Sequence, residues 1–141
     1  MIATDRFQKL EQFIEKLKKD VYPEPLTNDL FINHGIESIK SMVKPGQRIL
    51  DVGCGHGYAM KKFKDLGAEP IGITLDAEDH RKARFMGDDV RLMDMSFLEF
   101  KDGYFDGLWS RHSLEHSIFP YYTLSEFYRV LKPNGWIYIE L

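Results

Sequence analysis

Residues 48–57 read RILDVGCGHG, and this stretch decides the fold class. Its first five residues are mostly apolar, which is typical of a strand buried in a sheet. Glycines follow at positions 53, 55 and 57, where they let the backbone turn tightly and approach a ligand that a Cβ atom would exclude. Residues 58–66 then have helical spacing. The stretch therefore predicts a strand, a glycine-rich turn and a helix.

The same alternation of strands and helices continues along the rest of the chain. The pattern predicts strands at 71–75, 90–93, 105–110 and 136–141, and helices at 77–85 and 124–131. Pro133-Asn134-Gly135 is expected to close the last of these helices. Strands that alternate with helices predict an α/β fold, in which a mostly parallel sheet of five strands is covered by helices on both faces.

The first 44 residues have a different hydrophobic pattern, which predicts helices. Apolar residues recur at three- and four-residue steps from Phe7 to Val21, which is one stripe of an amphipathic helix. Thr27-Asn28-Asp29 provides N-capping residues for a second helix that runs to Ile39. We expect one domain over residues 1–141, with a helical cap at 1–44 and a core at 45–141.

The composition limits the function classes. With 43% hydrophobic residues the chain has enough apolar material for a packed core, in which Trp109 and Phe119 are expected. The net charge of -3, without a large basic block, argues against a nucleic acid or membrane partner. Cys54 is the single cysteine, so no intramolecular disulfide can form. No apolar run is long enough to span a bilayer, and we expect a cytoplasmic protein.

The spacing of the glycines indicates the kind of ligand. A dinucleotide-binding loop reads G-x-G-x-x-G, but here the third glycine comes one residue earlier. Asp51, at the end of the preceding strand, would repel phosphates and attract an ammonium group. The loop therefore favours a ligand that carries an amino acid and a nucleoside. A purely structural turn and a nicotinamide-dependent oxidoreductase are the alternatives.

Five segments in register resemble the class I S-adenosylmethionine-dependent methyltransferases, and the small-molecule enzymes of that family most of all. They are ILDVGCGHG (49–57), IGITLD (71–76), VRLMDM (90–95), FDGLWSRHSLEH (105–116) and RVLKPNGWIYIE (129–140). The resemblance covers residues 45 to 141. It implies a Rossmann-like three-layer sandwich, S-adenosylmethionine as cofactor and methyl transfer to a small-molecule acceptor.

The resemblance also assigns cofactor contacts around the glycine loop. Asp51 is expected to orient the ammonium group of the methionine part, directly or through a water molecule. Gly53, Gly55 and Gly57 are expected to line the methionine and the ribose.

Further contacts follow the third and fourth strands. Asp94 is expected to accept a hydrogen bond from the adenine amino group, and the Met95 backbone N–H to lie against the ring. Ser110 and Arg111 are expected to touch the methionine part through their backbone groups.

The ribose contact departs from the family pattern. The family has an acid near the end of the second strand that holds both ribose hydroxyls, whereas Thr74 occupies that position here. Either Asp76 takes over this contact, or Thr74 and Asp79 share it, as in the branch that the cyclopropane-fatty-acid synthases represent. The alternative is that both acids merely cap the helix that begins at Ala77.

The stretch RHSLEH (111–116) matches the H-x-x-E-H pattern of zinc proteases. Zinc binding would need a long helix and a third ligand, but no histidine follows His116 and Pro120 comes soon after it. We therefore expect no metal site. His116 is a candidate for contact with the acceptor or for general base catalysis, because an imidazole titrates near neutrality. The alternative is that His112 and His116 are surface and helix-cap residues.

The family continues past the fifth strand with a helix and two more strands, whereas this sequence stops at Leu141. The resemblance therefore implies either a fragment or a minimal version. An exposed fifth strand would invite pairing with a second chain, so a homo-oligomer is one expectation. A non-catalytic cofactor-binding or assembly module is the alternative to a methyltransferase.

Overall fold

The computed structural model describes residue 12 and residues 26–141. Contacts divide the chain into two compact units, residues 1–35 and residues 36–141. Helix α2 (Leu26–Ile39) confirms the second helix that the sequence predicts, but it begins at Leu26, so Thr27-Asn28-Asp29 lie in its first turn and not before it. The predicted helix from Phe7 to Val21 lies outside the described residues. The single domain with a cap at 1–44 stays a prediction.

Five parallel strands form one sheet, with the order β3-β2-β1-β4-β5. The strands are β1 (Arg48–Val52), β2 (Glu69–Thr74), β3 (Val90–Leu92), β4 (Phe105–Arg111) and β5 (Leu131–Glu140). The chain runs outward from β1 to β3 and then returns to β4 on the other side of β1. Open parallel sheets bind ligands at such a reversal, beyond the carboxyl ends of the strands, which here are β1 and β4.

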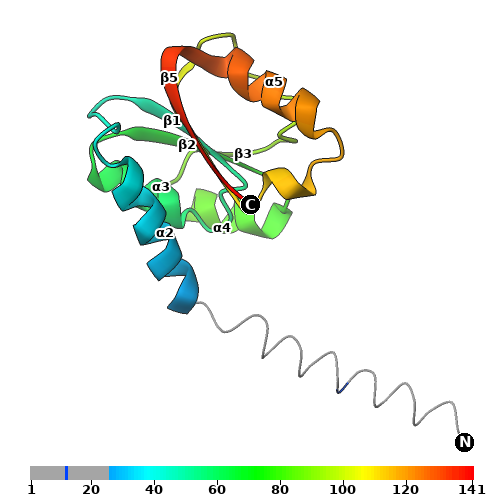
Figure 1. The fold of residues 1–141 in the computed structure, drawn as a ribbon. Helices are drawn as coiled ribbons and strands as arrows, with labels where there is room; N and C mark the ends of the chain where they lie inside the picture. Colours follow the sequence, from blue (N-terminus) through cyan, green and yellow to red (C-terminus); the bar gives the residue numbers. More distant parts are fainter. Residues whose placement is uncertain (1–11, 13–25) are drawn as a thin grey trace, which may run out of the picture. The chain divides into compact units, whose positions relative to one another are not determined.

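Helices cover both faces of this sheet, as Figure 1 shows. Helices α3 (Tyr58–Asp65) and α4 (Ala77–Phe85) lie on one face, and α5 (Pro120–Val130) lies on the other. A short 3-10 helix, η1 (Leu114–His116), follows β4. The predicted α/β three-layer sandwich is therefore confirmed. None of the helices in the described part of the chain is long and apolar enough to cross a membrane.

The core lies on both faces of the sheet. Leu50, Leu108 and Phe127 belong to the large cluster, which brings together strand residues and α5. On the opposite face Phe63 of α3 packs against Trp109, with ring centroids 5.7 Å apart, so the prediction that Trp109 lies in the core is confirmed. The same prediction is wrong for Phe119, which is 58% exposed just before α5.

The boundary between α5 and β5 differs from the prediction. The helix begins at Pro120 rather than Leu124, because a proline in the first turn needs no backbone donor. At the other end, β5 already begins at Leu131, and residues 132–135 bulge out of register with β4. Asn134 adopts a left-handed φ of 65° in this bulge. Pro133-Asn134-Gly135 therefore belongs to a strand irregularity and does not close the helix.

Candidate functional site

The glycine loop forms an open cradle at the carboxyl end of β1. Gly53, Gly55 and Gly57 have φ angles of 71°, 49° and 81°, in the left-handed region that favours glycine. The N–H groups of Gly53 and Cys54 donate to the Ile73 carbonyl at 2.9 and 3.0 Å, which ties the loop to β2. A Cβ atom added to Gly55 would meet no atom closer than 4.0 Å. The space above this glycine is therefore free for a ligand.

Asp51 has an unmatched acceptor below this cradle. Its side chain is 2% exposed, and Oδ2 has no hydrogen-bond partner among the described residues. Burial raises the pKa of its carboxyl group to about 7. A buried acceptor without a donor is rare in folded proteins. An ammonium group, directly or through a bridging water, would supply the missing donor, so Asp51 fits the amino-acid part of S-adenosylmethionine.

Ser113 holds the loop after β4 against the end of β1. Its hydroxyl lies 2.9 Å from the Val52 carbonyl and 3.0 Å from the Arg111 carbonyl, so it donates to one or shares its hydrogen between them. The same hydroxyl fills the space that a Cβ atom on Gly53 would need. Ser113 could not be predicted from the sequence, because a single serine after a histidine carries no pattern.

The residues proposed for the ribose separate into two roles. Asp76 caps α4, because its Oδ1 accepts from the N–H groups of Glu78 and Asp79, both at 2.8 Å. Thr74 is buried, and its hydroxyl accepts from the Asp76 N–H at 3.1 Å. The Asp79 carboxylate instead faces the glycine loop, with Oδ1 2.9 Å from Nε2 of His56. The structure thus brings Asp79 to the cradle and leaves Asp76 as a cap.

Asp94 and Met95 follow β3 at the same edge of the sheet as the glycine loop. Asp94 is exposed, and its Oδ1 accepts from the Ser96 N–H at 2.7 Å, which fixes a turn. The Met95 side chain is half-buried and packs against the large core cluster. The remaining acceptor capacity of Asp94 lies at the surface, where an amino group could reach it.

Ser110 and Arg111 end β4 in different environments. Ser110 is fully buried, and its hydroxyl has no hydrogen-bond partner in residues 26–141. The Arg111 side chain is largely buried, and its Nε donates to Oε1 of Glu140 at 3.0 Å. Tyr138 donates its hydroxyl to the other oxygen of Glu140 at 2.6 Å. Tyr138 and Glu140 were not predicted as site residues, because the sequence places them only in an apolar strand.

The Arg111–Glu140–Tyr138 cluster shifts two pKa values. Burial alone would raise the pKa of Glu140, but the Tyr138 hydroxyl and the Arg111 guanidinium outweigh it, so this pKa lies below its usual range. Burial, and then the bond to Glu140, raises the pKa of Tyr138 to about 12. The cluster therefore holds a stable negative charge on Glu140 at the carboxyl ends of β4 and β5.

The RHSLEH stretch does not form the long helix that the zinc motif needs. His112 has a left-handed φ of 48°, and its backbone N–H donates to the Glu140 carbonyl at 2.8 Å. His116 ends the three-residue helix η1, with an exposed side chain. No group of three potential metal ligands occurs among the residues that the structure describes. His116 lies beyond the carboxyl end of β4.

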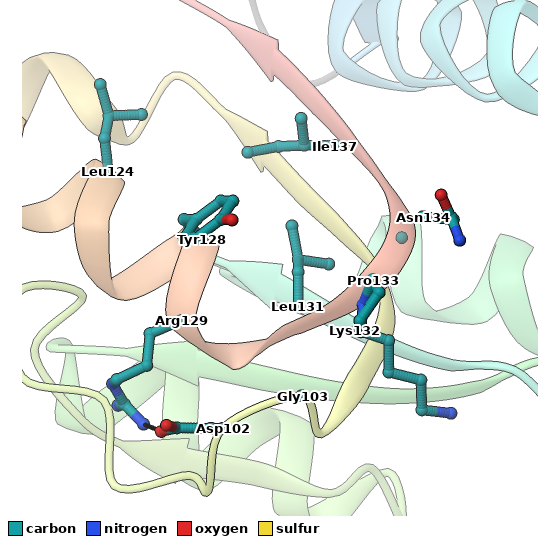
Figure 2. A pocket seen from close by; sticks show the side chains of 11 residues that line it. Asp102, Gly103, Leu124, Tyr128, Arg129, Leu131, Lys132, Pro133, Asn134 and Ile137 are labelled. Atoms are coloured by element: carbon teal, nitrogen blue, oxygen red, sulfur yellow. Dashed lines mark hydrogen bonds and ion pairs between the residues drawn. The ribbon is translucent and has the colours of Figure 1, made fainter.

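A groove of about 770 Å³ lies elsewhere, between α5 and the first half of β5. Figure 2 shows its apolar side chains, which include Leu124, Tyr128, Leu131 and Ile137. Arg129 and Asp102 form an ion pair of 2.9 Å at its rim. The groove lies toward the amino ends of β4 and β5, at the sheet edge opposite the glycine loop. It is therefore separate from the candidate cofactor site.

Comparisons with known proteins identify the family of the chain. A methyltransferase domain profile matches residues 50–139. The chain is 30% identical over 121 residues to methyltransferase phqN of Penicillium fellutanum, covering 79% of this chain and 37% of that protein. It is 37% identical over 107 residues to 24-methylenesterol C-methyltransferase 2 of Arabidopsis thaliana, covering 70% and 29%.

One solved structure is similar to this chain in fold and in sequence. The [4+2]-cyclase SpnF superposes with a TM-score of 0.71 at 30% identity, covering 79% of this chain and 44% of that one. The chain thus spans less than half the length of these relatives. The profile, the relatives and the strand order agree on one conclusion. The chain belongs to the class I S-adenosylmethionine-dependent methyltransferase domain family, whose cofactor is S-adenosylmethionine.

Proposed function

We propose that this chain is the cofactor-binding domain of an enzyme that transfers a methyl group to a small-molecule acceptor. The observation that carries the proposal is the buried Asp51 oxygen without a described donor, next to an open cradle of glycines. A purely structural turn would not need a carboxylate that is costly to bury. An ammonium group on the ligand removes that cost.

The residues around the crevice have distinct roles in this proposal. Asp51 orients the amino-acid part, the Asp79 carboxylate accepts from the ribose hydroxyls, and Asp94 accepts from the adenine amino group. Asp51 lies in β1, Asp79 lies in the first turn of α4 after β2, and Asp94 follows β3, so together they fix the ligand along its whole length. When bound, S-adenosylmethionine supplies a methyl group that its sulfonium activates. The protein contributes alignment of the acceptor with that group.

His116 is the proposed base for acceptors that must lose a proton. It lies after β4 and its side chain is exposed. Replacing it with alanine should lower turnover about 10²-fold for a phenolic or hydroxyl acceptor. The matched control is His112→Ala, which changes a neighbouring histidine. Unchanged turnover of the His116 variant would remove this role.

Methyl transfer can be tested without knowledge of the acceptor. The purified chain is incubated with S-adenosylmethionine that carries a tritiated methyl group and with separate pools of phenols, sterols and amines. Label in an extracted small molecule, lost in the Asp51→Ala variant, is the expected result. Cofactor binding without transfer to any pool would favour the non-catalytic alternative.

We also propose that β5 pairs with β5 of a second copy. No described strand occupies its outer edge, and Ile137 and Ile139 are 44% and 37% exposed on it. An apolar edge with unpaired backbone groups favours strand addition. Light scattering should show a dimer that Ile139→Lys weakens, with Leu92→Lys on β3 as control. A monomer at high concentration would contradict this proposal.

A further inference from the structure

His56 and Asp79 bridge two loops of the candidate cofactor site. His56 belongs to the glycine loop after β1, and Asp79 belongs to the first turn of α4 after β2. Nε2 of His56 lies 2.9 Å from Oδ1 of Asp79. The side chains are 48% and 29% exposed, so the pair lies at the surface of the crevice. The sequence analysis did not connect these residues, which are 23 positions apart.

The pair fixes the direction of the Asp79 carboxylate. The backbone of Asp79 is held by Asp76, whose Oδ1 accepts from its N–H at 2.8 Å. The imidazole of His56 then holds Oδ1 of Asp79. The second oxygen, Oδ2, is the nearest atom to a Cβ built on Gly55, at 4.0 Å. One carboxylate oxygen is therefore occupied, and the other is presented to the glycine cradle.

Stability alone does not explain this arrangement. An ion pair in which about half of one side chain is exposed to solvent contributes little to the free energy of folding. Asp79 also does not need His56 to complete the cap of α4, because Asp76 provides that cap. The consequence of the pair is instead that Oδ2 of Asp79, a hydrogen-bond acceptor, is oriented toward the glycine loop.

We propose that His56 is a positioning residue of the cofactor site, which turns the Asp79 carboxylate so that Oδ2 can accept from a ribose hydroxyl. The inference rests on the proposed function, because it needs a nucleoside in the cradle. In the opposite arrangement, His56 would compete with the ligand for Asp79, and the ligand would first have to break the His56–Asp79 pair. If His56 positions Asp79, loss of the imidazole weakens ligand binding. If His56 competes with the ligand, loss of the imidazole strengthens ligand binding.

Calorimetric titration with S-adenosylhomocysteine separates these cases. His56→Ala should weaken binding about fivefold, the scale of one hydrogen bond. His56→Gln should restore most of the affinity, because its amide carries an N–H donor of similar reach. In an Asp79→Ala background, His56→Ala should have no further effect. His80→Ala, which changes the next residue of α4, is the control and should bind as the unmodified chain does. The melting temperatures of all variants should agree within about 3 °C.

Three outcomes would overturn the inference. Affinity of His56→Ala within twofold of the unmodified chain would mean that the pair has no role in binding. Tighter binding would mean competition, and an equal loss in the Asp79→Ala background would mean that His56 acts independently of Asp79. Absence of binding by the folded, unmodified chain would overturn the proposed function together with this inference, and so is distinct from the other three.

Discussion

The Ser113 hydroxyl occupies the space beside Gly53 that any Cβ atom at this position would need, and it lies 2.9 Å from the Val52 carbonyl. The first glycine of the loop is therefore required for two reasons. Its φ of 71° disfavours other residues, and its neighbour leaves no room for them. Both reasons follow from the way in which the loop after β4 closes on the end of β1.

Gly53→Ala should reduce the free energy of unfolding by about 2 to 3 kcal/mol, because left-handed strain and a steric clash add. Gly46→Ala is the control, since its φ of 78° is similar but no atom lies within 4 Å of its added Cβ. We expect that control to lose only about 1 kcal/mol. Urea unfolding measures both values. Equal losses in the two variants would show that the contact with Ser113 has no cost.

Asp51 should make the ligand-free chain less stable as the pH rises. Its pKa in the folded chain is about 7, whereas an aspartate in an unfolded chain titrates near pH 4. Between these values the folded state holds a proton that the unfolded state has lost, so stability falls from about pH 4 to about pH 7. Asp51→Asn should therefore be more stable than the unmodified chain at pH 8, by about 2 to 4 kcal/mol, and similar to it at pH 4.

Asp106→Asn is a control for which we expect the opposite dependence of stability on pH. Burial would raise the pKa of Asp106, but the bonds from Lys132 and from the Arg48 backbone lower it, so its ionised form stabilises the fold. That variant should be less stable than the unmodified chain at pH 8, and the difference should shrink as the pH falls below about 4. Urea unfolding at several pH values gives both profiles. A difference for Asp51→Asn that does not vary with pH would contradict the raised pKa.

The sequence predicted the succession of strands and helices along the chain better than it predicted the roles of side chains. Strand, glycine loop and helix at 48–66 are local patterns, and local patterns survive into the structure. The prediction that Pro133-Asn134-Gly135 closes α5 was wrong, because the bulge at 132–135 depends on pairing with β4, which no local pattern reveals. The roles of Ser113 and Glu140 were missed for the same reason. Their partners lie 61 and 29 positions away.

Asp76 and Asp79 should respond differently to replacement. Asp76→Ala removes the cap of α4 and should cost about 1 kcal/mol of folding stability, with a modest change in affinity for S-adenosylhomocysteine. Asp79→Ala should leave stability nearly unchanged and weaken that affinity about tenfold. Thermal unfolding and calorimetry measure the two quantities. The reverse pattern would assign the ribose contact to Asp76.

Glu140→Gln should destabilise the chain, because the largely buried Arg111 loses its carboxylate partner. We expect a loss of about 1 to 2 kcal/mol at neutral pH. Since the pKa of Glu140 is lowered in the folded chain, its stabilisation is present above about pH 4 and is lost as the pH falls through the folded value.

Tyr138→Phe is the matched control for this cluster. It removes the bond to Glu140 but retains the ring that stacks on Trp109 at 4.3 Å. Its loss should be about 1 kcal/mol or less. A larger loss for Tyr138→Phe than for Glu140→Gln in urea unfolding would show that the hydroxyl, and not Arg111, depends most on the carboxylate.

The most direct test of the central claim is calorimetric titration of the chain with S-adenosylmethionine and S-adenosylhomocysteine, repeated with Asp94→Ala. Asp94 is exposed and makes one bond of its own turn, so its loss should leave the fold intact. Micromolar binding that the variant weakens about tenfold is the expected result. A folded chain that binds neither compound would contradict the claim that this crevice holds the cofactor.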